Sequence, residues 1–272
     1  MKKYPIGFNT EIHNEQENFV PMEVCKGVTE PKKSLVEVYF PHRGMGWTYY
    51  NDEFDLKVGD FVYVEGKLEG YRGQVTKVNY SFKIKLSDYK KVVAVIDTNV
   101  KGDIYLAGSH IVSFDKNVIP YSKVVTWFNS PQNDEDYVSS NDDANSFLLN
   151  DLSTMNILHD VADRGHYYFI QNRVAYIEID GTRGRAIVEG SDNYEIEFNY
   201  NNGEISNLIC SCFCSGTCKH EFAAMLQLKE TLEFITQNYD EEYKDYFAAV
   251  TKAVFMNTVM NKTVSGKISL EV

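Results

Sequence analysis

The chain has 272 residues, of which 43% are hydrophobic and 24% are charged. Its 27 Lys and Arg residues against 39 Asp and Glu residues give a formal net charge of −12. This composition excludes a wholly disordered chain and a uniformly basic surface for nucleic acid. No apolar run reaches the ~18 residues of a membrane-spanning helix, and the polar sequence after Lys3 lacks the apolar stretch of a signal peptide. We therefore expect a protein of the reducing cytoplasm that does not bind membranes.

The first half of the chain has the pattern of short β-strands. After the polar segment 1–34, runs rich in β-branched and aromatic residues predict strands at 35–40, 61–64, 73–78, 82–86 and 91–96. Strands roughly ten residues apart with Gly between them favour a small β-barrel. Further apolar segments lie at 104–106 and 124–128. We expect an N-terminal barrel domain over residues 1–128.

An acidic segment follows. Residues 129–146 contain five acidic residues, no basic residue and many turn formers, which is typical of a linker. The acidic character continues to residue 163. Residues 57–91 contain eight basic and four acidic residues, a local charge of +4. The net charge of −12 therefore conceals a mildly basic region in the first half.

The second half predicts an α+β domain over residues 147–272. Helical spacing of apolar residues favours a helix at 147–163, and the strand patterns that follow lie at 167–170, 174–179, 185–188, 194–200 and 205–209. Asn201-Asn202-Gly203 predicts a tight hairpin, because Asn and Gly tolerate positive φ. The remaining sequence predicts helices at Lys219–Tyr239 and Glu241–Met260.

Four of the five cysteines lie within nine residues and are followed by a histidine. Zinc prefers four thiolate and imidazole ligands in a tetrahedron. Cys210 and Cys212 lie at i and i+2 on the end of a strand and project to one side, while Cys218 and His220 lie at the start of a helix. We expect these four residues to hold a structural Zn²⁺. Cys214 is the alternative to Cys210, and is otherwise a free thiol beside the site.

Two other uses of the cluster are packing alone and a redox dithiol. A catalytic zinc would leave one position open for water, and a His-Glu-x-x-His pattern is absent from the sequence. We therefore expect a protein that is not an enzyme.

The cluster resembles the SWIM zinc finger. Cys-x-Cys, a gap of five residues and Cys-x-His before an apolar helix match that pattern. Residues 188–196 are similar to its V-x-G-S-x-x-Y-x-V lead-in, and residues 218–223 to its C-K-H-x-x-A helix start. The match covers about residues 165–235, and Cys214 within the gap departs from it. The resemblance implies a ββα zinc unit that serves DNA binding or protein binding.

A second resemblance lies at residues 56–79, which look like the KOW pattern of SH3-like barrels. Gly59-Asp60 precedes a strand of alternating Val, and Gly70 and Gly73 precede Gln74-Val75. Modules of this type imply RNA or protein binding.

Aromatic and basic residues are interleaved around this segment, and basic residues also occupy a later turn. Aromatic rings stack on bases, and cations contact phosphates. The candidate nucleic-acid-binding residues are Arg43, Trp47, Tyr71, Arg72, Lys77, Lys83, Lys85, Arg183 and Arg185.

The sequence fits two classes of binding partner. The favoured function is DNA or RNA binding. The alternative is a protein–protein adaptor whose acidic linker and helices meet a basic partner. The same aromatic residues also suit a barrel core, and residues 41–51 suit either a functional loop or a packed turn. The sequence does not indicate the oligomeric state.

Overall fold

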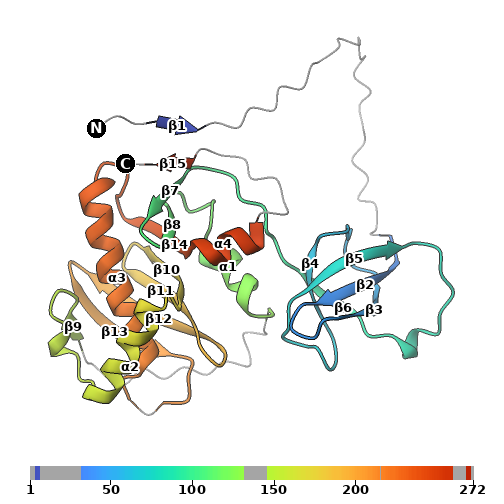
Figure 1. Ribbon diagram of the computed structural model, residues 1–272, viewed down its shortest axis with the longest axis horizontal. Helices are drawn as coiled ribbons and strands as arrows, with labels where there is room; N and C mark the ends of the chain where they lie inside the picture. Colours follow the sequence, from blue (N-terminus) through green and yellow to red (C-terminus); the bar gives the residue numbers. More distant parts are fainter. Residues whose placement is uncertain (1–3, 7–31, 132–145, 215, 260–267, 271–272) are drawn as a thin grey trace, which may run out of the picture. The chain divides into compact units, whose positions relative to one another are not determined.

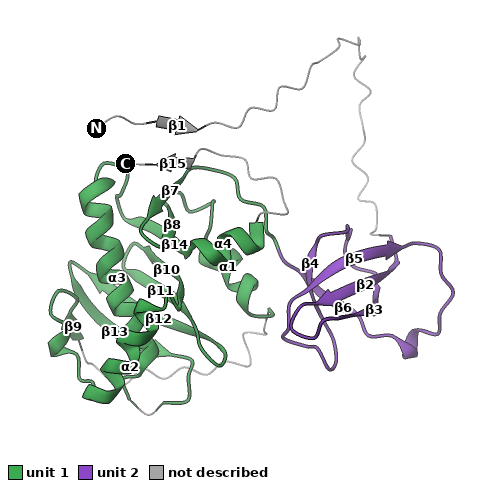
Figure 2. Ribbon diagram, in the orientation of Figure 1, with its two compact units in different colours: residues 1–5, 97–272 green, residues 6–96 purple. Residues whose placement is uncertain are grey.

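The computed structural model describes residues 4–6, 32–131, 146–214, 216–259 and 268–270 (Figure 1). The fold is mixed α+β, with two β-sheets and few helices. The chain forms two compact units, which we call the N-terminal unit (6–96) and the C-terminal unit (1–5 with 97–272; Figure 2). Within the described ranges, no helix has the length and apolar character needed to cross a membrane.

The N-terminal unit is a five-stranded antiparallel sheet in the order β3-β2-β5-β4-β6. Its strands are β2 (Ser34–Phe40), β3 (Met45–Asn51), β4 (Phe61–Val64), β5 (Gly73–Asn79) and β6 (Val92–Val95). On β2 the alternate residues Val36, Val38 and Phe40 are fully buried, as expected of a strand with one face on a core. An isolated bridge between Tyr50 of β3 and Lys91, the residue before β6, joins the two ends of the strand order.

Two predictions for this unit were wrong. Residues 82–86 form no strand but a loop leading into a 3₁₀ helix at Leu86–Asp88. Phe82 and Ile84 do alternate with exposed lysines, but no described strand pairs with this segment. Residues 41–51, expected as a loop or a packed turn, contain a turn at 41–44, but residues 45–51 form the strand β3.

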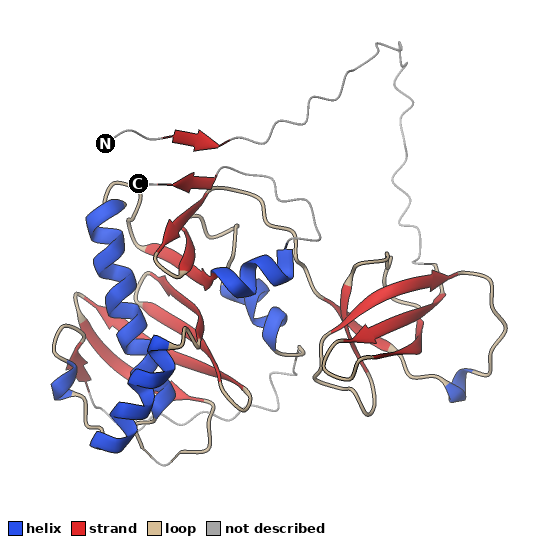
Figure 3. Ribbon diagram, in the orientation of Figure 1, coloured by secondary structure: helices blue, strands red, loops and turns tan. Residues whose placement is uncertain are grey.

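The C-terminal unit contains a ten-stranded sheet in the order β1-β15-β7-β8-β14-β10-β11-β12-β13-β9. Figure 3 shows strands in red and helices in blue. The strands before the acidic segment are β1 (Tyr4–Ile6), β7 (Ile104–Ala107) and β8 (His110–Ser113). Those after it are β9 (Ser146–Leu148), β10 (Val174–Asp180), β11 (Arg183–Glu189), β12 (Asn193–Asn201), β13 (Glu204–Cys210), β14 (Tyr246–Thr251) and β15 (Ile268–Leu270). The helices are α1 (Tyr121–Phe128), α2 (His159–Ile170), α3 (Lys219–Asn238) and α4 (Lys252–Val259).

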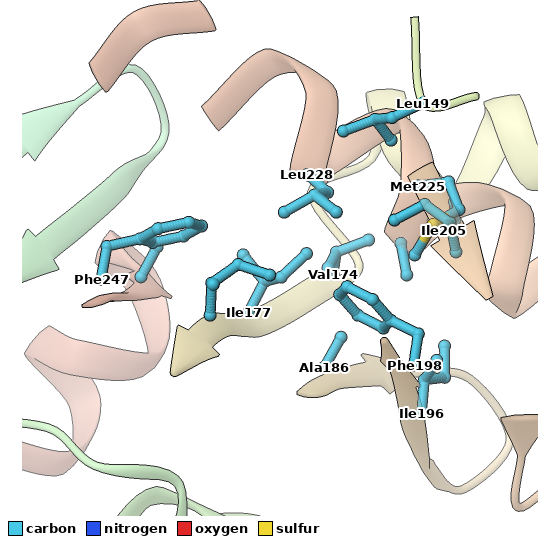
Figure 4. Close-up of a cluster of buried hydrophobic side chains, with 14 of the residues drawn as sticks. Leu149, Val174, Ile177, Ala186, Ile196, Phe198, Ile205, Met225, Leu228 and Phe247 are labelled. Carbon is cyan, nitrogen blue, oxygen red and sulfur yellow. The ribbon is translucent and has the colours of Figure 1, made fainter. Parts of the chain in front are cut away.

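One face of the central strands packs against α3 and forms the main core. Ile177, Ala186 and Phe198 from three adjacent strands lie in one buried cluster with Met225 and Leu228 of α3 (Figure 4). Each of these side chains is at most 2% exposed. This packing fixes α3 over the β12–β13 hairpin.

A glycine allows α2 to approach α3 closely. A Cβ on Gly165 would lie 2.8 Å from the carbonyl oxygen of Lys219 and 2.9 Å from the Phe222 ring. The contact lies at the first turn of α3, so α2 helps to hold the start of that helix.

Three predictions for the C-terminal unit were wrong. Residues 147–163 contain most of β9, a 3₁₀ helix (Leu152–Thr154) and the first five residues of α2 instead of one continuous helix, and 167–170 belong to α2 instead of a strand. The expected helix Glu241–Met260 is β14 followed by α4. All six residues of β14 are buried, so the strand lacks the alternation that would reveal it.

The expected helix over Lys219–Tyr239 is confirmed as α3, and the last four expected strands are confirmed as β10 to β13.

The boundary of the compact units differs from the expected boundary after residue 128. Residues 97–131 belong with the C-terminal unit, because β8 pairs with β14 in antiparallel register. Most of the expected linker, residues 132–145, lies outside the described residues, and so does Cys25.

Candidate metal centre

The β12–β13 hairpin brings the first two cysteines into place. Its turn has positive φ at Asn202 (49°) and Gly203 (87°), the conformation that the Asn-Asn-Gly sequence predicts. Cys210 ends β13 and lies opposite Ile196 of β12. β13 is therefore still paired with β12 at Cys210, the residue that carries the first thiol.

Hydrogen bonds continue this pairing one residue further. The Ser211 N–H donates to the Glu195 carbonyl oxygen at 2.9 Å, and the Glu195 N–H donates to the Ser211 hydroxyl oxygen at 2.9 Å. They fix the backbone between Cys210 and Cys212.

The second pair lies at the start of α3. Cys218 is the residue before the helix, and its sulfur accepts a hydrogen bond from the Glu221 N–H at 3.4 Å. The Glu221 carboxylate accepts one from the Cys218 N–H at 2.7 Å. This reciprocal cap fixes Cys218, and His220 follows on the first turn.

The four ligand atoms converge. The sulfurs of Cys210, Cys212 and Cys218 and a ring nitrogen of His220 all lie within 4.8 Å of one another. Nδ1 of His220 is 3.9 Å from the Cys210 sulfur and 3.8 Å from the Cys218 sulfur. A tetrahedral metal with bonds of about 2.3 Å to sulfur and 2.0 Å to nitrogen sets sulfur and nitrogen about 3.5 Å apart and two sulfurs about 3.8 Å apart, so a small contraction of the cluster would fit one metal ion.

Cys214 is outside this cluster. Its side chain is exposed, in a loop where Phe213 is also fully exposed. The structure thus groups Cys210, Cys212, Cys218 and His220 and leaves Cys214 as the remaining thiol.

Two tyrosines orient the His220 ring. The Tyr194 ring stacks on it with centroids 4.0 Å apart and an interplanar angle of 19°, and the Tyr168 ring meets it edge-on at 5.3 Å. Nε2 is buried and has no hydrogen-bond partner among the described residues, whereas Nδ1 faces the thiols. Nδ1 is therefore the ring nitrogen of His220 that is placed to bind a metal ion with the thiols.

The thiols perturb one another's ionisation. The pKa of Cys218 is lowered to about 4, first because the Cys210 thiol donates a hydrogen bond to its sulfur, with further donors at His220 and the Glu221 N–H. The same bond raises the pKa of Cys210, and burial raises that of Cys212 to about 12. Burial and the Cys218 charge raise the pKa of Glu221 to about 8. Closely packed thiolates repel one another, and a bound dication relieves this repulsion.

The candidate nucleic-acid residues of the N-terminal unit lie mostly on its surface. The exposed ones are Arg43, Trp47, Tyr71, Lys77, Lys83 and Lys85. Arg72 is half-buried, with its guanidinium 4.8 Å from the centroid of the Phe61 ring.

The two candidate arginines of β11 belong to the C-terminal unit and are already paired. Arg183 forms an ion pair with Glu197 at 3.0 Å on the surface. Arg185 is half-buried and pairs with Glu178 at 2.6 Å, and its guanidinium lies 4.5 Å from the centroid of the Tyr121 ring.

Sequence reasoning missed the buried carboxylate of Glu178, which is 1% exposed. In addition to this ion pair, its Oε2 accepts hydrogen bonds from the Tyr176 hydroxyl at 2.6 Å and the Tyr121 N–H at 3.0 Å. Burial raises the pKa of Tyr176 well above its usual range. The one signal in the sequence is an acidic residue within the apolar run Val174–Ile179.

Sequence reasoning also missed that His42 belongs to a cluster of aromatic rings. Its ring stacks on that of Tyr71 with centroids 4.3 Å apart.

Family models, curated proteins and solved structures offer no match to this chain. The metal cluster and the exposed aromatic residues are therefore the two features on which a function can be argued.

Proposed function

We propose that the chain is a zinc-binding protein of the SWIM type whose N-terminal unit binds nucleic acid. The convergence of three sulfurs and one imidazole nitrogen within 4.8 Å carries the zinc assignment. Thiolate and imidazole together suit zinc better than the harder cations, which prefer oxygen. The hairpin and helix that donate the ligands have the ββα order of that family.

The role we assign to the metal is structural. Four side chains of the chain itself would supply all four ligands of a tetrahedral site, which would leave no position for a reacting water. The zinc would join the end of β13 to the start of α3. The metal would therefore contribute to folding of this region.

Nucleic-acid binding rests on the N-terminal unit. The bridge between Tyr50 and Lys91 supports closure of its sheet into an SH3-like barrel. Exposed aromatic rings and lysines on this unit supply stacking surfaces and phosphate contacts. The proposal does not rest on Arg183 and Arg185, because Arg183 forms an ion pair with Glu197 and Arg185 forms one with Glu178.

The test is binding of the full chain to labelled single-stranded and duplex DNA and RNA over a salt series. We expect affinity to fall as salt rises, with log K against log[salt] flatter by about 0.7–0.9 for each phosphate contact removed. Replacing Lys77, Lys83 and Lys85 by Gln should flatten the slope, whereas Lys244→Gln in the C-terminal unit should not. No binding to any of the four at low salt contradicts this function.

The exposed Phe213 favours a second function, a protein–protein adaptor. Its side chain is fully exposed beside the metal cluster, and such a residue suits insertion into a partner's pocket. In that case Phe213→Ala would abolish capture of a stoichiometric protein partner without changing zinc content.

A further inference from the structure

Four aromatic rings gather at one place in the N-terminal unit. The Phe40 ring meets His42 at 6.1 Å and Trp47 at 5.9 Å, both edge-on. The His42 ring in turn stacks on Tyr71 at 4.3 Å with an interplanar angle of 22°. The rings come from β2, the following turn, β3 and the loop before β5, so the fold assembles the cluster.

The cluster is buried at its base and exposed at its outer edge. Phe40 is fully buried, whereas Trp47 is 37% exposed and Tyr71 is 47% exposed. His42 is exposed as well. Phe40 therefore anchors a surface of three accessible rings.

Hydrogen-bonded turns hold the outer rings. After β2, the N–H groups of Arg43 and Gly44 both donate to the Phe40 carbonyl oxygen at 3.0 Å. In the other loop the Tyr71 N–H donates to the Leu68 carbonyl oxygen at 3.1 Å, just after Gly70 with φ of 80°. The rings are thus positioned before any ligand arrives, which lowers the entropy cost of binding.

The charge beside this surface suits an anion. An arginine follows each ring of the stacked pair, Arg43 after His42 and Arg72 after Tyr71. Arg43 is exposed and forms no ion pair within the described ranges. Glu69 is the nearest acidic residue along the chain, and the segment 57–91 that contains it carries a net charge of +4.

We propose that His42, Trp47 and Tyr71 form a stacking surface for unpaired bases of a single-stranded nucleic acid, with Arg43 contacting its phosphates. This proposal rests on the nucleic-acid function proposed above. Every base has a π-face, so such a surface binds with little sequence preference. A duplex hides these faces, so the surface selects single strands, whether RNA or DNA.

The two tryptophans give a direct optical test in the full chain. Trp47 is 37% exposed and belongs to the surface, whereas Trp127 is 3% exposed and belongs to the C-terminal unit. Titration with a single-stranded homopolymer should quench tryptophan fluorescence. Trp127→Phe should keep this quenching, and Trp47→Phe should lose it.

Affinity measurements complete the test. His42→Ala and Tyr71→Ala should each weaken binding about 5- to 100-fold at constant salt, and Tyr71→Phe should restore it. Arg43→Ala should flatten the salt dependence. Tyr39 is the matched control, because it is 39% exposed on the same unit but outside the cluster, and Tyr39→Ala should leave affinity unchanged.

The outcomes separate this proposal from the broader function. If the full chain binds single strands but His42→Ala and Tyr71→Ala bind like the unaltered protein, the stacking surface is wrong and nucleic-acid binding stands. Tighter binding to duplex than to single strand overturns the surface in the same way. If neither RNA nor DNA binds, the stacking surface and the nucleic-acid function are both wrong. If only a protein partner quenches the fluorescence of Trp47, the surface binds protein instead.

Discussion

Cys218 and Glu221 exchange two hydrogen bonds across the first turn of α3, one to the Cys218 sulfur and one to the Glu221 carboxylate. A residue proposed as a metal ligand is therefore also the cap of the helix that carries His220. Binding of a metal ion at this cluster would therefore link metal binding to helix initiation through one side chain.

Removing the Glu221 carboxylate tests this cap. Glu221→Ala leaves the buried Cys218 N–H without its acceptor, and we expect a loss of about 1 kcal/mol in unfolding free energy. Glu221→Gln keeps an oxygen acceptor and should be close to the unaltered protein. Urea unfolding of both variants with metal present checks this, and equal stability of the two would contradict the cap.

The approach of α2 to α3 predicts an unusual effect of alanine. Ala normally stabilises a helix by about 1 kcal/mol relative to Gly. Gly165→Ala should instead destabilise the protein, because the new Cβ would lie 2.8 Å from the backbone oxygen of Lys219. Gly216→Ala is the control, since its Cβ would meet nothing within 4 Å. A rise in the unfolding midpoint for Gly165→Ala would show that the helices are less closely packed.

The ion pair between Arg185 and Glu178 should stabilise the fold and take no part in binding. Arg185→Met leaves Glu178 buried without its charge partner, and we expect a loss of about 3–5 kcal/mol. Arg183→Met removes only a surface pair and should cost at most about 1 kcal/mol. Urea unfolding measures both. A loss of nucleic-acid affinity in a folded Arg185→Met protein would contradict this claim and show that Arg185 takes part in binding.

Buried His110 predicts a pH dependence of stability. Its Nε2 donates to the Val174 carbonyl oxygen at 2.9 Å, and burial is the first cause that lowers its pKa to about 4. As the pH falls, His110 becomes protonated near pH 6.5 in the unfolded chain but only near pH 4 in the folded chain. Stability is therefore full above pH 6.5 and falls as pH drops toward 4, by roughly 3 kcal/mol.

The matched variants isolate this effect from other groups. His110→Gln should flatten the dependence of unfolding free energy on pH between 7.5 and 4.5. His166→Gln, at an exposed position, should leave it unchanged. The same slope in all three proteins would mean that His110 titrates normally in the folded state.

The sequence predicted the metal cluster and α3 because their signals are local. The four ligands lie within eleven residues, and the apolar stripe of α3 has the period of a helix. The sequence also favoured Cys214 as the remaining thiol but left it as the alternative to Cys210, because only the folded loop places its side chain outside the cluster.

Features that depend on distant partners were missed. Glu178 becomes a buried ion-pair partner only when β11 and α1 surround it, and His42 meets Tyr71 only when two loops come together. For β14, burial on both faces removed the alternation of a strand, and its alanines favoured a helix instead.

The zinc content of the full chain is the most direct test of the central claim that Cys210, Cys212, Cys218 and His220 hold one metal ion. Native mass spectrometry after reconstitution with zinc should show one zinc per chain in the unaltered protein and in Cys214→Ser. Cys212→Ser should lose it. No bound zinc in the unaltered protein, or loss of zinc in Cys214→Ser with retention in Cys210→Ser, would contradict the account.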